Sequence, residues 1–274
     1  MSSQNIQIEH VMFRSGDVRC AADLYLSSDR KLATPIPGVV LGHSGGNVKE
    51  ALVGPASYLA EAGFAALAID YRTYGASEGE PRGQLFPEKQ AEDFRNGVSY
   101  LQTRPEIDSR RIGVWGVAMG ASIAIQAAVL DRRIKCVVAQ TPDLLNGWRQ
   151  ILEGGGRERF GKMFTALEQD WQRRFETGES LRVPWPNFED EVTQSYVKQA
   201  MEIYPTYRHE ITLESFEHML VWAPENLIEH LTPTPLLFVT TGGYDPYHIL
   251  DDVQIAYKRA GEPKRLELLP YDVV

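Results

Sequence analysis

The fold is decided by the stretch Arg111-Ile112-Gly113-Val114-Trp115-Gly116-Val117-Ala118-Met119-Gly120-Ala121-Ser122. Its apolar first half predicts a buried strand, and its alanine-rich continuation predicts a helix. The small residues Gly116 and Gly120 permit a tight turn between the two, which places residue 118 at an exposed apex. Ala118 occupies this apex, and its methyl group cannot attack a carbonyl carbon. Ser122 lies one helical turn further on, where we expect it to face the interior.

Short apolar runs alternate with longer helical patterns on both sides of this stretch. The runs that predict core strands are bounded by Gly, Pro or Asp and cover residues 37–42, 65–70, 111–116, 135–139 and 235–240. One helical pattern begins near Tyr58, and two others cover residues 89–102 and 119–130. This alternation predicts an α/β fold with a mostly parallel central sheet flanked by helices. The segment from Ile6 to Leu26 alternates and contains Gly16-Asp17, which predicts an antiparallel hairpin at the sheet edge.

The segment between Thr141 and Pro235 is about ninety residues long, far more than a single crossover helix needs. We therefore predict an α/β core formed by residues 1–142 and 232–274, with a helical cap inserted at residues 143–231. Apolar side chains recur at helical spacing inside the insertion, at Phe160, Met163, Phe164, Leu167, Trp171 and Phe175. This apolar face predicts a helix that packs on the α/β core. Alternatively, part of it lines an apolar pocket, because a cap over the carboxyl ends of parallel strands encloses the ligand crevice.

Composition limits the partners of the protein. The chain has 274 residues, 43% of them hydrophobic, and a formal net charge of −9. This acidic balance argues against a nucleic-acid or anionic-membrane partner and favours a small, neutral or weakly charged ligand. The expected partner is a small apolar substrate, with a homodimer left open. The N-terminal residues lack a signal-peptide pattern, and no run approaches the roughly 18 apolar residues of a membrane span, so we expect a cytoplasmic protein. The two cysteines lie in strand-like runs, and neither a metal site nor a cofactor is predicted.

Four segments together resemble the motifs of one enzyme superfamily, namely residues 41–50, 70–82 and 105–108 and the stretch 111–122. On these motifs the chain is similar, over nearly its whole length from about Ile8 onward, to the dienelactone-hydrolase-like and dipeptidyl-peptidase-like branch of the α/β-hydrolases. That branch includes polyketide-processing hydrolases and acyltransferases. The resemblance implies an α/β-hydrolase fold in which Ala118 stands at the position of the family's nucleophilic serine.

The resemblance also implies an oxyanion hole and an acid. In the family, the loop after the strand ending at residue 42 supplies one backbone N–H, here that of Ser44 or a neighbour. The residue after the nucleophile, Met119, supplies the other. The acid of the family follows the next core strand in a Gly-x-x-Asp turn, which Gly242-Gly243-Tyr244-Asp245 matches. Asp245 is therefore the predicted acid, and the alternative is a loop aspartate held by its own turn amides.

Four residues are candidates for substrate binding. His43 lies beside the predicted oxyanion loop, where it could orient a carbonyl or, alternatively, belong to a structural hydrogen-bond network. Trp148 and Phe164 belong to the aromatic insertion, and Tyr244 belongs to the turn that carries the predicted acid. All four side chains can contact an apolar or carbonyl-bearing ligand.

The base is missing from its usual place. Members of the family carry a catalytic histidine just after the last strand, which here covers residues 265–270, but no histidine follows it in the sequence. His248 lies three residues after Asp245, and both residues would belong to one loop rather than meet across the site. We therefore treat His248 as a weaker candidate for the base.

These features leave three functional hypotheses. The first is an α/β-hydrolase-superfamily enzyme that hydrolyses or transfers the acyl group of a small apolar ester, thioester or lactone, in a form inactivated at Ala118. The second is a natural descendant that cyclises, isomerises or dehydrates a polyketide-like molecule. The third is a binding protein without catalysis. Loss of a triad serine costs on the order of a millionfold in turnover, so ordinary serine hydrolysis is not expected of this chain.

Overall fold

The sheet at the centre of the molecule is mostly parallel. A computed structural model of the chain describes residues 6–28, 35–186, 190–243, 245 and 248–272. Among these residues, eight strands form one sheet in the order β1-β2-β4-β3-β5-β6-β9-β10. They are β1 (Ile6–Ser15), β2 (Val18–Ser27), β3 (Ile36–Gly42), β4 (Ala65–Ile69), β5 (Ile107–Val117), β6 (Ile134–Gln140), β9 (Leu236–Thr241) and β10 (Lys264–Leu269). The pairs β1–β2 and β2–β4 are antiparallel, and the other pairs are parallel.

The sequence prediction of the strands is confirmed. Each of the five apolar runs forms a strand of this sheet, and Ser15 pairs with Val18 across the hairpin turn at the edge. Strand β4 is buried along its whole length because it lies inside the sheet with helices over both faces. Its side chains alternate between two cores, with Leu67 on one face and Ala66 on the other.

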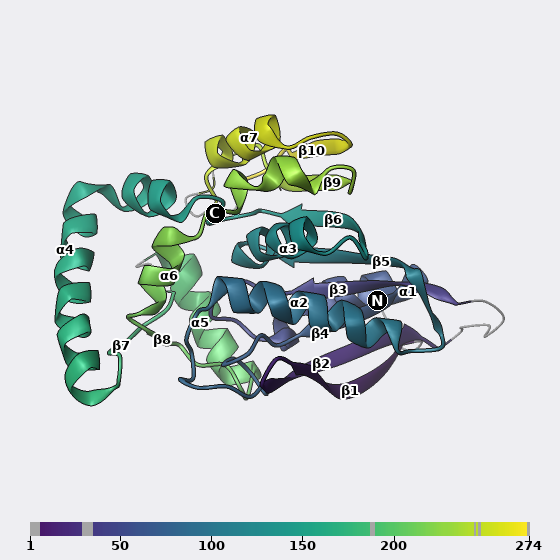
Figure 1. Cartoon of the computed structure of the whole chain (residues 1–274), viewed down its shortest axis with the longest axis horizontal. Helices are drawn as coiled ribbons and strands as arrows, with labels where there is room; N and C mark the ends of the chain where they lie inside the picture. Colours follow the sequence, from purple (N-terminus) through teal and green to yellow (C-terminus); the bar gives the residue numbers. More distant parts are fainter. Residues whose placement is uncertain (1–5, 29–34, 187–189, 244, 246–247, 273–274) are drawn as a thin grey trace.

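Helices cover both faces of the sheet (Figure 1). They are α1 (Val53–Glu61), α2 (Pro87–Gln102), α3 (Met119–Leu130) and α7 (Leu250–Arg259), and a 3₁₀ turn at Lys49–Leu52 precedes α1. Buried side chains of α2, α3 and α7 share the core that contains Leu67, whereas those of α1 share the core that contains Ala66. In the described part of the chain, no helix is both long enough and apolar enough to cross a membrane.

The segment predicted to form the insertion, residues 143–231, follows β6 and precedes β9. It contains α4 (Gly147–Thr177), β7 (Arg182–Val183), α5 (Glu191–Ile203), β8 (Ile211–Thr212), α6 (Ser215–Val221) and two 3₁₀ turns at Pro224–Asn226 and Ile228–Leu231. Strands β7 and β8 pair with each other in a separate small sheet. Helix α4 is interrupted at Gly156, which has φ 70, and it extends along one side of the molecule away from the central sheet (Figure 1).

The apolar face predicted on α4 is covered only in part. Leu167 is fully buried and clusters with Leu213 and Leu220 of the same insertion. Trp171 and Phe175, further along the same face, are 44% and 87% exposed. The helix contacts α6, and Ile151 near its start packs against the main core, so that only part of its apolar face is covered.

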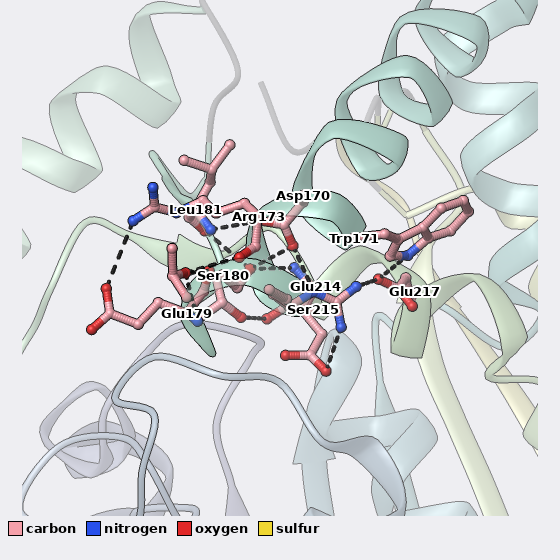
Figure 2. Close-up of polar contacts among 12 residues, drawn as sticks. Asp170, Trp171, Arg173, Glu179, Ser180, Leu181, Glu214, Ser215 and Glu217 are labelled. Carbon is pink, nitrogen blue, oxygen red and sulfur yellow. Dashed lines mark hydrogen bonds and ion pairs between the residues drawn. The ribbon is translucent and has the colours of Figure 1, made fainter.

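A polar network ties the end of α4 to the start of α6 (Figure 2). The carboxylate of Asp170 is fully buried and accepts hydrogen bonds from Leu181 N at 2.6 Å and from Ser180 Oγ at 2.8 Å. Arg174 donates to Asp170 at 2.9 Å and forms an ion pair with Glu214 at 2.9 Å. The buried charge is therefore compensated, and the network fixes the turn that follows α4.

Candidate active site

The turn between β5 and α3 has the geometry of a nucleophile elbow. Ala118 has φ 52 and ψ −124, a conformation that strains a residue with a Cβ. A Cβ on Gly116 would lie 2.1 Å from Gly120 O, and a Cβ on Gly120 would lie 2.4 Å from His43 O. Glycine is therefore required on both sides of the turn. Residue 118 lies at the apex, but 7% of its surface is exposed, so the apex is enclosed by the surrounding chain rather than open to solvent.

The loop after β3 lies against this elbow. Gly42 pairs with Gly116 in the sheet, which makes the carboxyl ends of β3 and β5 neighbours. A Cβ on Gly45 would lie 2.8 Å from Met119 Sδ, so the loop passes directly over the start of α3. Ser44 and Met119, the residues predicted to supply the oxyanion hole, thus belong to two segments in contact. That their N–H groups converge on one substrate oxygen remains a prediction.

His43 lies beneath this loop. Its side chain is fully buried, and its Nδ1 lies 2.8 Å from Ser44 O, to which it can donate. Burial lowers the pKa of His43 to about 4, although the hydrogen bond to Ser44 acts in the opposite direction, so the ring is neutral near pH 7. The ring also packs edge-on against Tyr71 at 4.5 Å. This location favours the alternative that His43 supports the loop, and direct substrate binding by His43 remains untested.

Two aromatic residues of the insertion contact the same loop, and the sequence analysis did not single out either for this role. Trp185 Nε1 donates to Gly45 O at 3.0 Å, and a Cβ on Gly46 would lie 2.5 Å from Trp185 Cδ1. Tyr196 accepts a short hydrogen bond from Asn47 Nδ2. The insertion therefore helps to set the position of the predicted oxyanion loop.

Asp245 and His248 form a hydrogen-bonded pair at the carboxyl end of β9. His248 Nδ1 lies 2.9 Å from Asp245 Oδ2, and His248 N donates to Asp245 Oδ1 at 3.0 Å. Both side chains are mostly enclosed, with 16% of the histidine and 3% of the aspartate exposed. Burial lowers the pKa of His248, but the hydrogen bond to Asp245 and the charges of Asp143 and Asp245 outweigh it, so the pKa is raised. The pair has the arrangement of a base with its orienting carboxylate.

Asp143 completes a group of three ionisable residues with this pair. It follows β6, and the residues around it, Thr141 and Leu144, have φ 38 and φ 50, which are strained values for residues other than glycine. Its Oδ1 is buried and has no hydrogen-bond partner among the described residues. Burial raises the pKa of Asp143 to about 6, while the charge of His248 lowers it and that of Asp245 raises it further. The only sequence signal for this residue was an aspartate three residues after a core strand.

The structure describes two of the three aromatic residues that were predicted to contact the substrate. The ring of Trp148 lies 5.3 Å from that of Phe160 and 6.0 Å from that of Phe164, so the first half of α4 carries an aromatic cluster. Trp148 is 51% exposed. Contact of Trp148 and Phe164 with a substrate remains a prediction, and Tyr244 lies outside the described residues.

Ser122 does not offer a substitute nucleophile. Its side chain is fully buried, its Oγ donates to Met119 O at 2.9 Å, and it accepts from Trp222 Nε1 at 3.2 Å. It faces the interior, as we expect from its place one turn into α3. Across the described ranges, no three His, Cys, Asp or Glu side chains are grouped as a metal ion would require.

The described chain continues beyond β10 beside the turn that carries Asp245. A Cβ on Gly243 would lie 2.2 Å from Asp272 Oδ1 and 2.7 Å from Tyr271 O. An aspartate thus lies in the part of the fold where the resemblance places a histidine.

Comparison with known proteins identifies the relatives of this chain. The family profile of X-Pro dipeptidyl-peptidases (S15 family) matches residues 15–270. A polyketide transferase from Gibberella fujikuroi is 26% identical over 261 residues, which cover 85% of this chain and 81% of that protein. The thiohydrolase aneE from Aspergillus aculeatus is 28% identical over 243 residues, covering 84% of this chain and 76% of its own length.

Solved structures show the same architecture. The α/β-hydrolase GrgF from a Penicillium species has a TM-score of 0.80 at 22% identity, with 96% of this chain and 89% of that chain covered. A hypothetical protein from Pseudomonas aeruginosa has a TM-score of 0.80 at 26% identity, with 97% and 86% covered. The chain therefore has the α/β-hydrolase fold, as the motifs implied.

Proposed function

We propose a function from the premise that the chain belongs to the X-Pro dipeptidyl-peptidase (S15) family of α/β-hydrolases and that it is similar to a polyketide transferase and a thiohydrolase. The protein is an enzyme of the hydrolase or transferase type. Its substrate is a small, apolar, polyketide-like ester, thioester or lactone, and the reaction is hydrolysis or acyl transfer. The names of the two relatives support the polyketide substrate and the thioester bond.

The pair formed by Asp245 and His248 carries this proposal. Since Ala118 cannot form an acyl-enzyme, the acceptor, which is water or a substrate hydroxyl, attacks the carbonyl carbon directly. With Nδ1 engaged by the carboxylate 2.9 Å away, Nε2 of His248 is the nitrogen that takes the acceptor proton. The N–H groups of Ser44 and Met119 stabilise the oxygen of the tetrahedral intermediate. The intermediate then expels the thiolate or alkoxide, which regains the proton from His248.

The test measures thiol release from a medium-chain β-ketoacyl thioester of a small thiol by the protein as it stands. We expect release above the buffer rate without any acyl adduct in the intact mass, and a fall of about 10²- to 10⁴-fold in His248→Gln. The matched control is His230→Gln, because His230 is exposed and pairs with Glu229 on the surface. A covalent adduct, a rate equal to that of buffer, or an unchanged rate in His248→Gln would each contradict the proposal.

A second candidate function is favoured by Asp143. A carboxylic acid whose pKa is raised to about 6 remains partly protonated near neutral pH and can donate a proton to a leaving hydroxyl or an enolate. This chemistry fits cyclisation, isomerisation or dehydration of a polyketide-like molecule. The candidate is tested with a polyketone that has no thioester. Rearrangement by the parent that is lost in Asp143→Asn supports it, and absence of rearrangement removes it.

A further inference from the structure

A small pocket lies at the junction between two loops of the core and the insertion. The core side is formed by the loop after β3, including Gly46, and by the loop after β4, including Arg82. The insertion contributes Arg182, Thr206, Arg208 and Glu210. None of these residues is Ala118, Asp245 or His248, so the pocket needs an explanation of its own.

The pocket is positively charged in a protein that is negatively charged overall. Three arginines line it, and a single carboxylate, Glu210, accompanies them at 3.3 Å from Arg182 Nη1. The whole chain carries a formal net charge of −9. A concave site with a local excess of positive charge concentrates small anions against this background.

Two of the three guanidinium groups keep donors for a ligand. Arg82 is committed to the protein, because its terminal nitrogens donate to Ser77 O and Gly75 O. Arg182 and Arg208 each use Nη1 for protein contacts, to Arg82 O at 2.6 Å and to Tyr207 O at 2.9 Å. Across the described residues, their Nε and Nη2 atoms make no protein hydrogen bond. These atoms form the planar fork that binds a carboxylate or phosphate with two parallel hydrogen bonds.

Thr206 adds an independent observation. Its Oγ1 is buried and has no hydrogen-bond partner among the residues that the structure describes. A buried hydroxyl without a partner is unfavourable, and an anion oxygen close to it would accept its proton. Thr206 thus lines the same small space as Arg182 and Arg208.

We propose that this pocket binds the oxyanion group of a small ligand, a carboxylate or a phosphate, between Arg182, Arg208 and Thr206. A bound anion would connect the insertion, which supplies these three residues, to the core loops of Gly46 and Arg82. Gly46 belongs to the same loop as Ser44, so occupancy also restrains the predicted oxyanion loop. The proposal concerns binding alone and does not depend on the acyl chemistry.

The test titrates the protein with inorganic phosphate and, separately, with acetate, at constant ionic strength maintained with sodium chloride. We expect saturable binding by calorimetry and a rise in Tm that chloride does not reproduce. The anion that binds more tightly identifies the ligand group. The double variant Arg182→Gln/Arg208→Gln should bind at least tenfold more weakly, and Thr206→Val should weaken binding severalfold while keeping the side-chain shape.

Arg110→Gln is the matched control, because the Arg110 side chain is 87% exposed and pairs with Asp108, two residues away in the sequence. Each variant must show the parent Tm in the absence of added anion, and Thr206→Val alone decides the test if the double variant does not fold. Equal shifts with chloride, or unchanged affinity in the variants that fold, would overturn the proposal.

Discussion

The two halves of the candidate site differ in what they retain. On the side of β3 and β5, the backbone keeps the shape of a nucleophile elbow, with Ala118 at φ 52 between two required glycines, but no reactive side chain. On the side of β6 and β9, three ionisable side chains, Asp143, Asp245 and His248, lie together.

The difference shows that backbone geometry and side-chain chemistry are separable in this fold. The amides of Ser44 and Met119 depend on the path of the main chain, which the loss of a hydroxyl at residue 118 leaves intact. Proton transfer depends on ionisable side chains, and a carboxylate and an imidazole on one short loop suffice to form a pair. The predictions below test this contrast, from the largest expected effect to the smallest.

Gly120→Val tests whether the elbow side depends on backbone packing. The new Cβ would lie 2.4 Å from His43 O and 2.6 Å from Gly42 O, both main-chain atoms that cannot move aside. We expect a loss of more than about 4 kcal/mol in the free energy of unfolding, measured by urea denaturation. Gly161→Val is the control, because nothing lies within 4 Å of a Cβ there. Similar stabilities of the two variants would refute the requirement.

Asp143→Asn tests whether the half of the candidate site beside β6 and β9 depends on ionisation of a buried carboxyl. The folded pKa of Asp143 is raised from 3.8 to about 6, so the folded state binds the proton more tightly than the unfolded state. The stability that this proton contributes is present below pH 4 and is lost as the pH rises through 6. The variant should therefore gain about 3 kcal/mol over the parent between pH 4 and pH 8.

Urea denaturation at a series of pH values measures this difference. Asp17→Asn, at an exposed position in the edge hairpin, is the control for loss of a carboxylate at the surface. A flat pH dependence for Asp143→Asn would mean that this carboxyl is not enclosed as described.

Trp185→Phe tests the support that the insertion gives to the elbow side. The variant keeps an aromatic ring but loses the hydrogen bond from Nε1 to Gly45 O, which contributes about 1 kcal/mol. We expect faster hydrogen exchange of the amides at residues 44–47. The control is Trp171→Phe, which loses a comparable hydrogen bond to Glu217 within the insertion. If the amides at residues 44–47 exchange at the same rate in both variants, Trp185 does not fix the position of this loop.

Ala118→Gly tests the strain at the apex itself. Glycine adopts positive φ without the steric cost of a Cβ, so the substitution should stabilise the fold by about 0.5–1 kcal/mol. Ala121→Gly, inside α3, should instead destabilise by about 1 kcal/mol, because glycine weakens a helix interior. The sharpest contradiction would be a loss of stability in Ala118→Gly equal to that in Ala121→Gly.

Local patterns in the sequence were sufficient for the α/β architecture and for the elbow. Strand and helix periods, the Gly16-Asp17 turn and the glycines at 116 and 120 express steric rules that act between near neighbours along the chain. The same rules placed Ser122 in the interior. The apolar pattern of α4 predicted the helix but not its partner, because amphipathicity does not identify the surface that a helix contacts.

Only the tertiary structure decided how the ionisable groups meet. His248 was a weak candidate in the sequence because it follows Asp245 so closely, yet the bend of their loop brings Nδ1 within 2.9 Å of the carboxylate. Asp143 carried no recognisable motif, and its enclosure depends on strands that are far apart in sequence but adjacent in the sheet. The contact of Trp185 with Gly45 likewise spans 140 residues. Such encounters follow from the packing of the whole chain, since hydrogen bonding and burial depend on neighbours in space rather than in sequence.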